Sequence, residues 1–386
     1  MLAAAWLGAA ALLWPTSVPG GLDLPELDAA RFFSGPELDR AESYERVARL
    51  ITVGGELVLV IVLALYAWRG ARLSRESAAG RIGTGMLLGM LGLAIVWLVH
   101  LPFDVLALWW QRRHDISHVG YVQFLFGDWA ALGAEFLFIC FALLIVMVLA
   151  GVLGRRWWVA GAPTFVGLGL LFAFLYPYLL PLERLDDPEL RADARSFARQ
   201  EGLDPIPVRV EEVGAETTAP NAEAAGFGVS RRVILWDTLL DGRFEDDEVR
   251  VVLAHELGHH GREHLPKLVG WYALFAMPGA WLIAVATRRR GGMGVAEAVP
   301  LGLFVYVALQ LAAAPVQNVI SRRYEAEADW QALQLTRDPD AALGLFQGFT
   351  ETALADPDPP RWAYVLLETH PPVLDRIAMV EAWERR

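Results

Sequence analysis

Long apolar runs alternate with shorter polar segments along the whole chain. Six of the runs are long enough to cross a bilayer as helices, which takes about 20 residues each. Tryptophans lie near the ends of several runs, where an interfacial aromatic belt is expected. The pattern therefore predicts a multi-span bundle of membrane helices. The six runs cover residues 49–68, 84–103, 129–152, 157–180, 268–287 and 297–320.

A shorter apolar run, rich in alanine and leucine, covers residues 2–14. It has the length of the apolar core of a signal peptide, but the usual positively charged start does not precede it. Two interpretations remain open: a cleaved signal, or a first span that ends near Pro15. We favour the span, which predicts about seven spans in all.

Polar stretches divide the chain into membrane and soluble parts. Residues 1–181 are predicted to form an N-terminal membrane region of about five spans, with an acidic, proline-broken segment at 15–48. Residues 182–267 have the composition of a soluble insertion, and residues 268–320 carry the last two spans. Residues 321–386 are expected to complete the soluble domain.

The soluble insertion mixes helical and strand-like patterns. A charged helix is predicted over 186–200, and a second helix over 244–264 has four acidic residues in its first turn, which suits the positive end of the helix dipole. Between them, short β-type runs cover 208–213, 225–230 and 232–236. The fold class is therefore mainly α, with an α+β domain and a small β-sheet on a membrane bundle. After residue 319, we expect a helix through 335, a proline-rich loop near 357–360 and a closing helix from 372.

The predicted helix over 244–264 carries the string His255-Glu256-Leu257-Gly258-His259. Histidines four residues apart share one helix face, so both imidazoles can hold a single metal ion. Glu256 lies between them and can reach a water on that ion as a general base. This ligand pattern is that of a zinc protease with about one Zn²⁺ per chain.

Such a site needs a third protein ligand. Glu325 and Asp329 lie four residues apart on one helix face, whereas Glu327 lies roughly on the opposite side. We predict Glu325 as the third ligand, and Asp329 as the acceptor that orients a ligand histidine through its other ring nitrogen. His260 and His264 are placed well around the helix from the ligand face, as surface or supporting residues rather than ligands.

Several strings together resemble the type I CAAX prenyl protease family of multi-span zinc metallopeptidases, and its shorter relative HtpX. They are VLAHELGH at 252–259, SRRYEAEAD at 321–329 and HPPVLDRI at 370–377. The resemblance covers nearly the whole chain. It implies seven spans around a water-filled chamber that a zincin-type protease domain closes at one end. The family's Asn-Ala-Tyr or Asn-Ala-Phe is here Asn221-Ala222-Glu223, which leaves the substrate preference open.

The resemblance also implies roles for three further residues. His370 and Arg376 become catalytic candidates that contact the substrate or the transition state. Asn221 becomes a substrate-binding candidate, hydrogen-bonded to the backbone of a peptide laid against the sheet edge. Each residue has an ordinary alternative: a buried histidine beside two prolines, a surface arginine and a turn asparagine.

Composition and charge limit the partners. Of the 386 residues, 55% are hydrophobic and 20% are charged, and the formal net charge is −12. A soluble protein has about a quarter of its residues charged, so the composition supports a membrane protein. The acidic balance argues against a nucleic-acid partner. The expected partners are the lipid bilayer and a peptide or protein substrate, lipidated or not. The single Cys140 lies in an apolar run and is expected to be a packing residue.

The positions of the arginines bear on the orientation. By the positive-inside rule, the arginine-rich loops face the cytoplasm, which places His255 outside it. The family resemblance implies the reverse, and we lean slightly to the charge count. The Ala-, Arg- and Gly-rich composition is typical of bacteria, so we expect a multi-pass protein of a bacterial plasma (inner) membrane. The loops in question contain Arg69, Arg72, Arg75, Arg81, Arg155, Arg156, Arg288, Arg289 and Arg290.

The leading interpretation is a membrane-embedded, CAAX-protease-like zinc metalloendopeptidase. An HtpX-like protease for quality control of membrane proteins is the alternative. A scaffold that has lost catalysis is disfavoured by the intact metal motif. A transporter would need ionisable residues at mid-depth in its spans. These are sparse: Glu56, His100 and Glu135.

Overall fold

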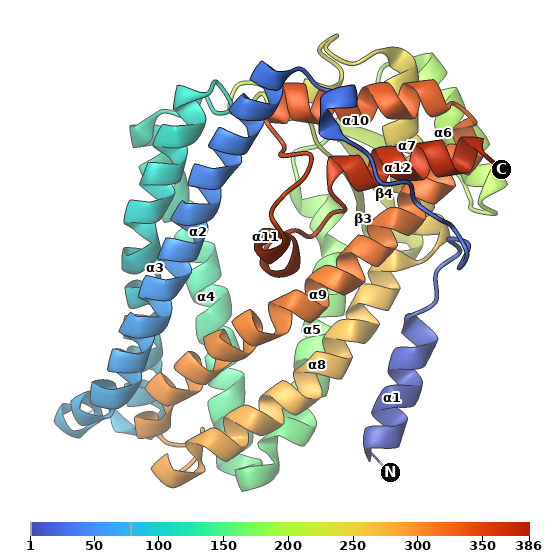
Figure 1. Cartoon of the computed structure of the whole chain (residues 1–386). Coiled ribbons are helices and arrows are strands. Elements are labelled where there is room, and N and C mark those ends of the chain that lie inside the picture. The colour runs from blue at the N-terminus through green and yellow to red at the C-terminus, as the bar shows by residue number, and fades with distance from the viewer. Residues whose placement is uncertain (1, 78) are drawn as a thin grey trace.

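The long helices form one half of the molecule, and the short elements gather over one end of them (Figure 1). The computed structural model describes residues 2–77 and 79–386. The side chains at 2–3, 74–76, 128–132 and 134–135, and with them those of Arg75 and Glu135, lie outside this description. The long helices are α2 (Gly35–Arg69), α3 (Gly80–Arg113), α4 (Tyr121–Leu153), α5 (Trp157–Leu179), α8 (His264–Thr287) and α9 (Val299–Thr336).

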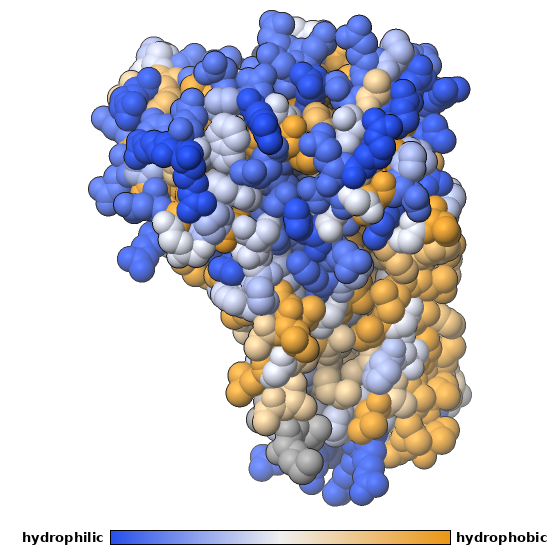
Figure 2. Space-filling model, turned by 90° about the vertical axis from the view of Figure 1, so that its right-hand side faces the viewer, coloured by the Kyte–Doolittle hydropathy of each residue, from blue (hydrophilic) through white to orange (hydrophobic). Residues whose placement is uncertain are grey.

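Within the described residues, five helical stretches are long and apolar enough to cross a membrane. One of them, Phe136–Leu179, runs through α4, a 3-10 turn and α5, and so contains two of the predicted spans. Helix α1 (Leu2–Leu13) is apolar but shorter. Figure 2 shows a mostly hydrophobic surface over this half and a hydrophilic surface over the other. The multi-span helical bundle is confirmed, and the number of seven spans stays a prediction.

Glycines allow the membrane helices to approach closely. Gly85, Gly89 and Gly92 lie along one face of α3, where a Cβ atom would collide with side chains of α4 or α9. Small residues at such positions let apolar helices pack without a hydrophobic driving force between them. Glu56 and His100, which come from α2 and α3, lie 3.9 Å apart and so pair with each other.

A small mixed sheet lies at the polar end. Within the described part of the chain, its order is β1-β2-β4-β3. β2 and β4 are parallel, and β3 pairs antiparallel with β4 at the edge of the sheet. The predicted strand at 225–230 is wrong, because Gly226 and Gly228 adopt positive φ angles and turn the chain there. The strands are β1 (Glu183–Arg184), β2 (Val208–Glu211), β3 (Ala222–Ala225) and β4 (Arg232–Trp236).

The helix predicted over 244–264 is in fact two helices. Helix α7 covers Asp246–Gly261, and α8 begins at His264. Glu263, with a left-handed φ of 56°, separates them. At the other end of α7, the backbone N–H of Glu245 donates to the Glu248 carboxylate in a capping box. The break redirects the chain immediately after the metal motif.

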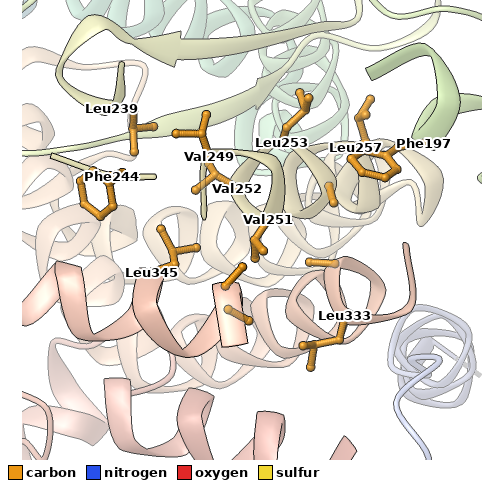
Figure 3. Close-up of a cluster of buried hydrophobic side chains, with 14 of the residues drawn as sticks. Phe197, Leu239, Phe244, Val249, Val251, Val252, Leu253, Leu257, Leu333 and Leu345 are labelled. Atoms are coloured by element: carbon orange, nitrogen blue, oxygen red, sulfur yellow. The ribbon is translucent and has the colours of Figure 1, made fainter. Parts of the chain in front are cut away.

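Helix α7 is held by a continuous apolar core (Figure 3). Leu253 and Leu257 are fully buried, and burying such a side chain stabilises the fold by roughly 1.5–3 kcal/mol. The core joins α7 to the sheet and to four helices of the polar end. These are α6 (Pro188–Gln200), the end of α9, α10 (Pro339–Ala353) and α12 (Val373–Glu384). The helices predicted over 186–200 and from 372 are thereby confirmed as α6 and α12.

An ion-pair cluster ties α2 to the C-terminal loops on both sides of α11 (Arg361–Leu366). Arg49 of α2 is 7% exposed and contacts Asp356 at 2.8 Å and Glu368 at 3.3 Å. The Asp356 side chain is 5% exposed. This cluster links a membrane helix directly to the polar end.

Replacing Arg49 by Met should lower the free energy of unfolding by about 3–5 kcal/mol, because Asp356 would remain buried without its cation. Arg31→Met is the matched control: its pair with Glu381 is 60% exposed at the arginine, and losing it should cost less than about 1 kcal/mol. Chemical unfolding in detergent micelles measures both. Equal losses in the two variants would contradict the linking role of Arg49.

Candidate metal centre

Three side chains meet where α7 crosses α9. The Nε2 atom of His255 lies 3.3 Å from Oε2 of Glu325, and Nε2 of His259 lies 3.6 Å from its Oε1. The two Nε2 atoms are 3.0 Å apart. The candidate ligand atoms all lie within 4.8 Å of one another. The structure therefore brings together the three residues predicted as metal ligands.

The donor set fits a zinc ion. Two Zn–N bonds of about 2.0–2.1 Å at a tetrahedral angle place their nitrogens ~3.3 Å apart, close to the observed spacing. The Oε2 atom of Glu325 is buried and has no hydrogen-bond partner among the described residues. A buried carboxylate oxygen without a partner is costly, and a cation between the three side chains would remove that cost.

Asp329 holds His255 from behind. Its Oδ1 accepts a hydrogen bond from Nδ1 of His255 at 2.9 Å, so the His255 Nε2 atom is directed at Glu325. Arg376 donates to both carboxylate oxygens of Asp329, at 2.8 and 2.5 Å. Asp329 therefore lies where it was predicted to lie. Only 11% of the Arg376 side chain is exposed, so it is not an ordinary surface arginine. A direct contact of Arg376 with substrate stays a prediction.

Burial sets the protonation of the three motif residues. Burial lowers the pKa of His259 to about 3, which keeps the imidazole in the neutral form that binds metals. Burial also lowers the pKa of His255, but the hydrogen bond to Asp329 and the nearby Glu325 carboxylate raise it overall to about 10. Burial raises the pKa of Glu256 to about 7. Because a metal must displace a proton from His255, metal binding is expected to weaken with acidity.

An open cleft of about 280 Å³ borders the three ligand side chains. Glu256, which is 7% exposed, lines it together with Ala224 of β3. Asn221 is exposed at the start of the same edge strand. His370 is 64% exposed, and its Nε2 lies 3.5 Å from Oε2 of Glu325. The substrate-side candidates Asn221 and His370 therefore share one cleft with the metal motif.

His264 and Glu327, which the sequence analysis places away from the ligand face, lie one after the other behind His259. His264 Nδ1 is 2.8 Å from His259 Nδ1, and its Nε2 is 3.0 Å from Oε2 of Glu327. The expected position of His264, on the far side of one continuous helix, is wrong because the break at Glu263 turns His264 back toward His259. Three histidines together with the acidic EAEAD string at 325–329 were the signal that could have suggested this pair. His260 lies elsewhere, with Nε2 2.9 Å from the Arg232 carbonyl oxygen.

A His-Glu-x-x-His helix, completed by a carboxylate from a later helix at the end of an apolar bundle, defines the class of membrane metallopeptidases. A family model gives the narrower assignment. Peptidase family M48 matches residues 184–384, which is more than half of the chain. The chain belongs to this family.

Individual relatives agree with that assignment. The uncharacterized metalloprotease YhfN of Bacillus subtilis is 28% identical over 245 residues, which are 60% of this chain and 57% of the relative. A CAAX prenyl protease 1 homolog of Arabidopsis thaliana is 27% identical over 234 residues, 57% of this chain and 54% of the relative. The chain thus spans just over half the length of these curated relatives.

The fold matches a solved structure over almost its whole length. The crystal structure of S. mikatae Ste24p has a TM-score of 0.73 at 18% identity, and the match covers 98% of this chain and 96% of that one. Together with the sequence relatives, this confirms the resemblance to the type I CAAX prenyl proteases.

Replacing Asp329 by Asn should weaken zinc binding about 10–100-fold, because the amide is uncharged and its NH₂ group cannot accept the hydrogen bond that Arg376 Nε donates to Oδ2. Competition with a chromophoric chelator on the purified protein measures the Kd. Glu381→Gln removes a carboxylate from α12 without touching Asp329 and should leave the Kd unchanged. An unchanged Kd in the Asp329 variant would show that His255 needs no such support.

Proposed function

We propose that this chain is a membrane-embedded zinc metalloendopeptidase that holds one Zn²⁺ between His255, His259 and Glu325. The observation that carries the proposal is the meeting of three ligand atoms, one of them a buried carboxylate oxygen without a hydrogen-bond partner among the described residues. When bound there, zinc supplies a Lewis acid that acidifies a water and polarises the scissile carbonyl.

Glu256 is the general base of the proposed reaction. It accepts a proton from the attacking water and later passes that proton to the leaving amine. Burial raises its pKa to about 7, so the carboxyl group can both take up and release a proton near neutral pH. A neighbouring cation favours the charged, proton-accepting form.

The substrate is proposed to bind as an extended peptide along β3. Among the described residues, this strand pairs with β4 alone, which leaves its other edge toward the cleft. Asn221 would hydrogen-bond the peptide backbone by strand addition. His370 also lines the cleft and would contact the developing oxyanion or the substrate. Glu223 also lines this cleft, at the position where the family carries an aromatic residue.

Membrane-derived peptides or proteins, lipidated or not, are the proposed substrates. Two apolar stretches lead directly to the metal ligands: α8 starts at His264 beside His259, and α9 continues without a break from its apolar part to Glu325. A substrate that leaves the bilayer along these helices reaches the cleft. Both CAAX-type processing and HtpX-like quality control are consistent with this route.

Glu256→Gln should abolish peptide cleavage and leave zinc bound, because the amide keeps the size of the side chain but cannot accept the proton. Peptide hydrolysis and metal content are measured on the same preparation. A chelator should stop peptide cleavage by the parent protein, and added zinc should restore that cleavage. Cleavage that survives in the Glu256 variant, at the rate of the parent, would exclude this mechanism.

The metal centre is proposed to face the extracytoplasmic side. Arg288–Arg290 follow the far end of α8 from His264, and an arginine-rich end is expected in the cytoplasm. Because the C-terminal helix α12 packs beside the metal centre, a reporter fused after Arg386 lies on the same side of the membrane as the metal centre. Alkaline phosphatase fused there should be active and green fluorescent protein dark; the opposite pair of results would place the centre in the cytoplasm.

A further inference from the structure

A buried chain of polar groups extends from His259 away from the proposed metal position. Nδ1 of His259 faces Nδ1 of His264 at 2.8 Å, and Nε2 of His264 faces Oε2 of Glu327 at 3.0 Å. The other oxygen of Glu327 accepts the backbone N–H of Ser17 at 2.6 Å. His264 is 1% exposed and Glu327 is 2% exposed. The proposed reaction uses neither of these two residues.

The direction of the hydrogen bonds follows from the chemistry of the two ends. The Ser17 backbone can only donate, and an ionised carboxylate can only accept, so Nε2 of His264 must carry a proton toward Glu327. In a neutral imidazole the other nitrogen is an acceptor. Nδ1 of His264 therefore accepts a hydrogen bond from the N–H at Nδ1 of His259. This leaves the Nε2 lone pair of His259 directed at Glu325 and at the proposed cation.

The surroundings fix the far end of this chain. Gln331 donates to Oγ of Ser17 at 2.9 Å, and the Tyr324 hydroxyl donates to the Leu13 carbonyl at 2.7 Å. The Tyr324 ring also stacks on His264, with centroids 4.7 Å apart and an angle of 11° between the planes. These contacts hold Ser17 and His264 in place, so the acceptor of His259 is held by the N-terminal segment as well as by α9.

We propose that His264 and Glu327 are positioning residues that fix the ring and tautomer of His259, as Asp329 does for His255. The proposal rests on the zinc site of the proposed function. Both imidazole ligands would then be oriented by a carboxylate. Asp329 bonds His255 directly, whereas Glu327 acts on His259 through the imidazole of His264. Such supports are worth about 10–100-fold in metal affinity.

Glu327→Gln gives the sharpest test because it reverses the direction of the hydrogen bonds between Glu327, His264 and His259. The single oxygen of the amide must accept from the Ser17 N–H, so its NH₂ group faces His264 and makes that nitrogen an acceptor. His264 then donates to His259, whose remaining proton moves to Nε2 and blocks the metal. We expect the zinc Kd to rise about 10–100-fold, with an apo protein that remains folded by circular dichroism.

A second pair of variants keeps the test decisive if Glu327→Gln does not fold. His264→Leu removes the acceptor of His259 and should raise the zinc Kd about 10–100-fold, whereas His264→Asn keeps an oxygen acceptor and should lose less. His260→Leu is the matched control: this histidine is also buried, but its imidazole bonds the Arg232 carbonyl rather than the side chain of a proposed ligand. Its zinc Kd should stay within about threefold of the parent value.

Chelator competition and the absorption bands of the cobalt-substituted protein are the readouts. Glu327→Gln and His264→Leu proteins that bind zinc within about threefold of the parent would overturn the proposal, as would an equal loss in His260→Leu. The two proposals fail separately. A parent that binds zinc but cleaves no peptide would remove the protease function alone, and an active parent whose Glu327 variant keeps full affinity would remove only this inference.

Discussion

The crossing of α7 over α9 is the contact on which the metal centre depends. Two imidazoles come from α7 and the carboxylate comes from α9, so the distance between these helices sets whether the three ligand atoms can share an ion. Gly258 lies at the crossing, where a Cβ would sit 3.0 Å from Cβ of Gln331. Leu253, Leu257 and Leu333 are buried around it and keep the helices in register.

The same crossing joins the membrane bundle to the chemistry. Helix α9 runs from Val299 to Thr336 with Pro315 inside it, so its apolar part and its three acidic residues belong to one helix. Glu325 faces the ligands, Asp329 supports His255 and Glu327 lies behind His264. The ligand Glu325 and both of these carboxylates therefore lie on the helix whose apolar part belongs to the membrane bundle.

The sequence predicted what depends on short-range periodicity. His255 and His259 share a helix face, as do Glu325 and Asp329, and one helical turn suffices to place each pair. The apolar runs predicted the long helices in the same way. Helix periodicity alone does not predict the proposed roles of His264 and Glu327, because they depend on a left-handed residue, Glu263, in a helix-like pattern. The pairing of Arg376 with Asp329 is equally long-range and has no local signature.

The strand at the cleft shows a similar limit. The composition predicts a strand at 225–230, whereas β3 covers Ala222–Ala225. Positive φ angles at Gly226 and Gly228 turn the chain and end the strand there. That shift matters for function, since it places Glu223 and Ala224, rather than the residues after them, beside Glu256.

X-ray absorption at the zinc edge of the purified protein tests the central claim most directly. The account predicts zinc in the protein as isolated, with two imidazole nitrogens at about 2.0–2.1 Å and oxygen ligands at similar distance. A spectrum with a single imidazole, with sulfur ligands, or a preparation without bound zinc would contradict it.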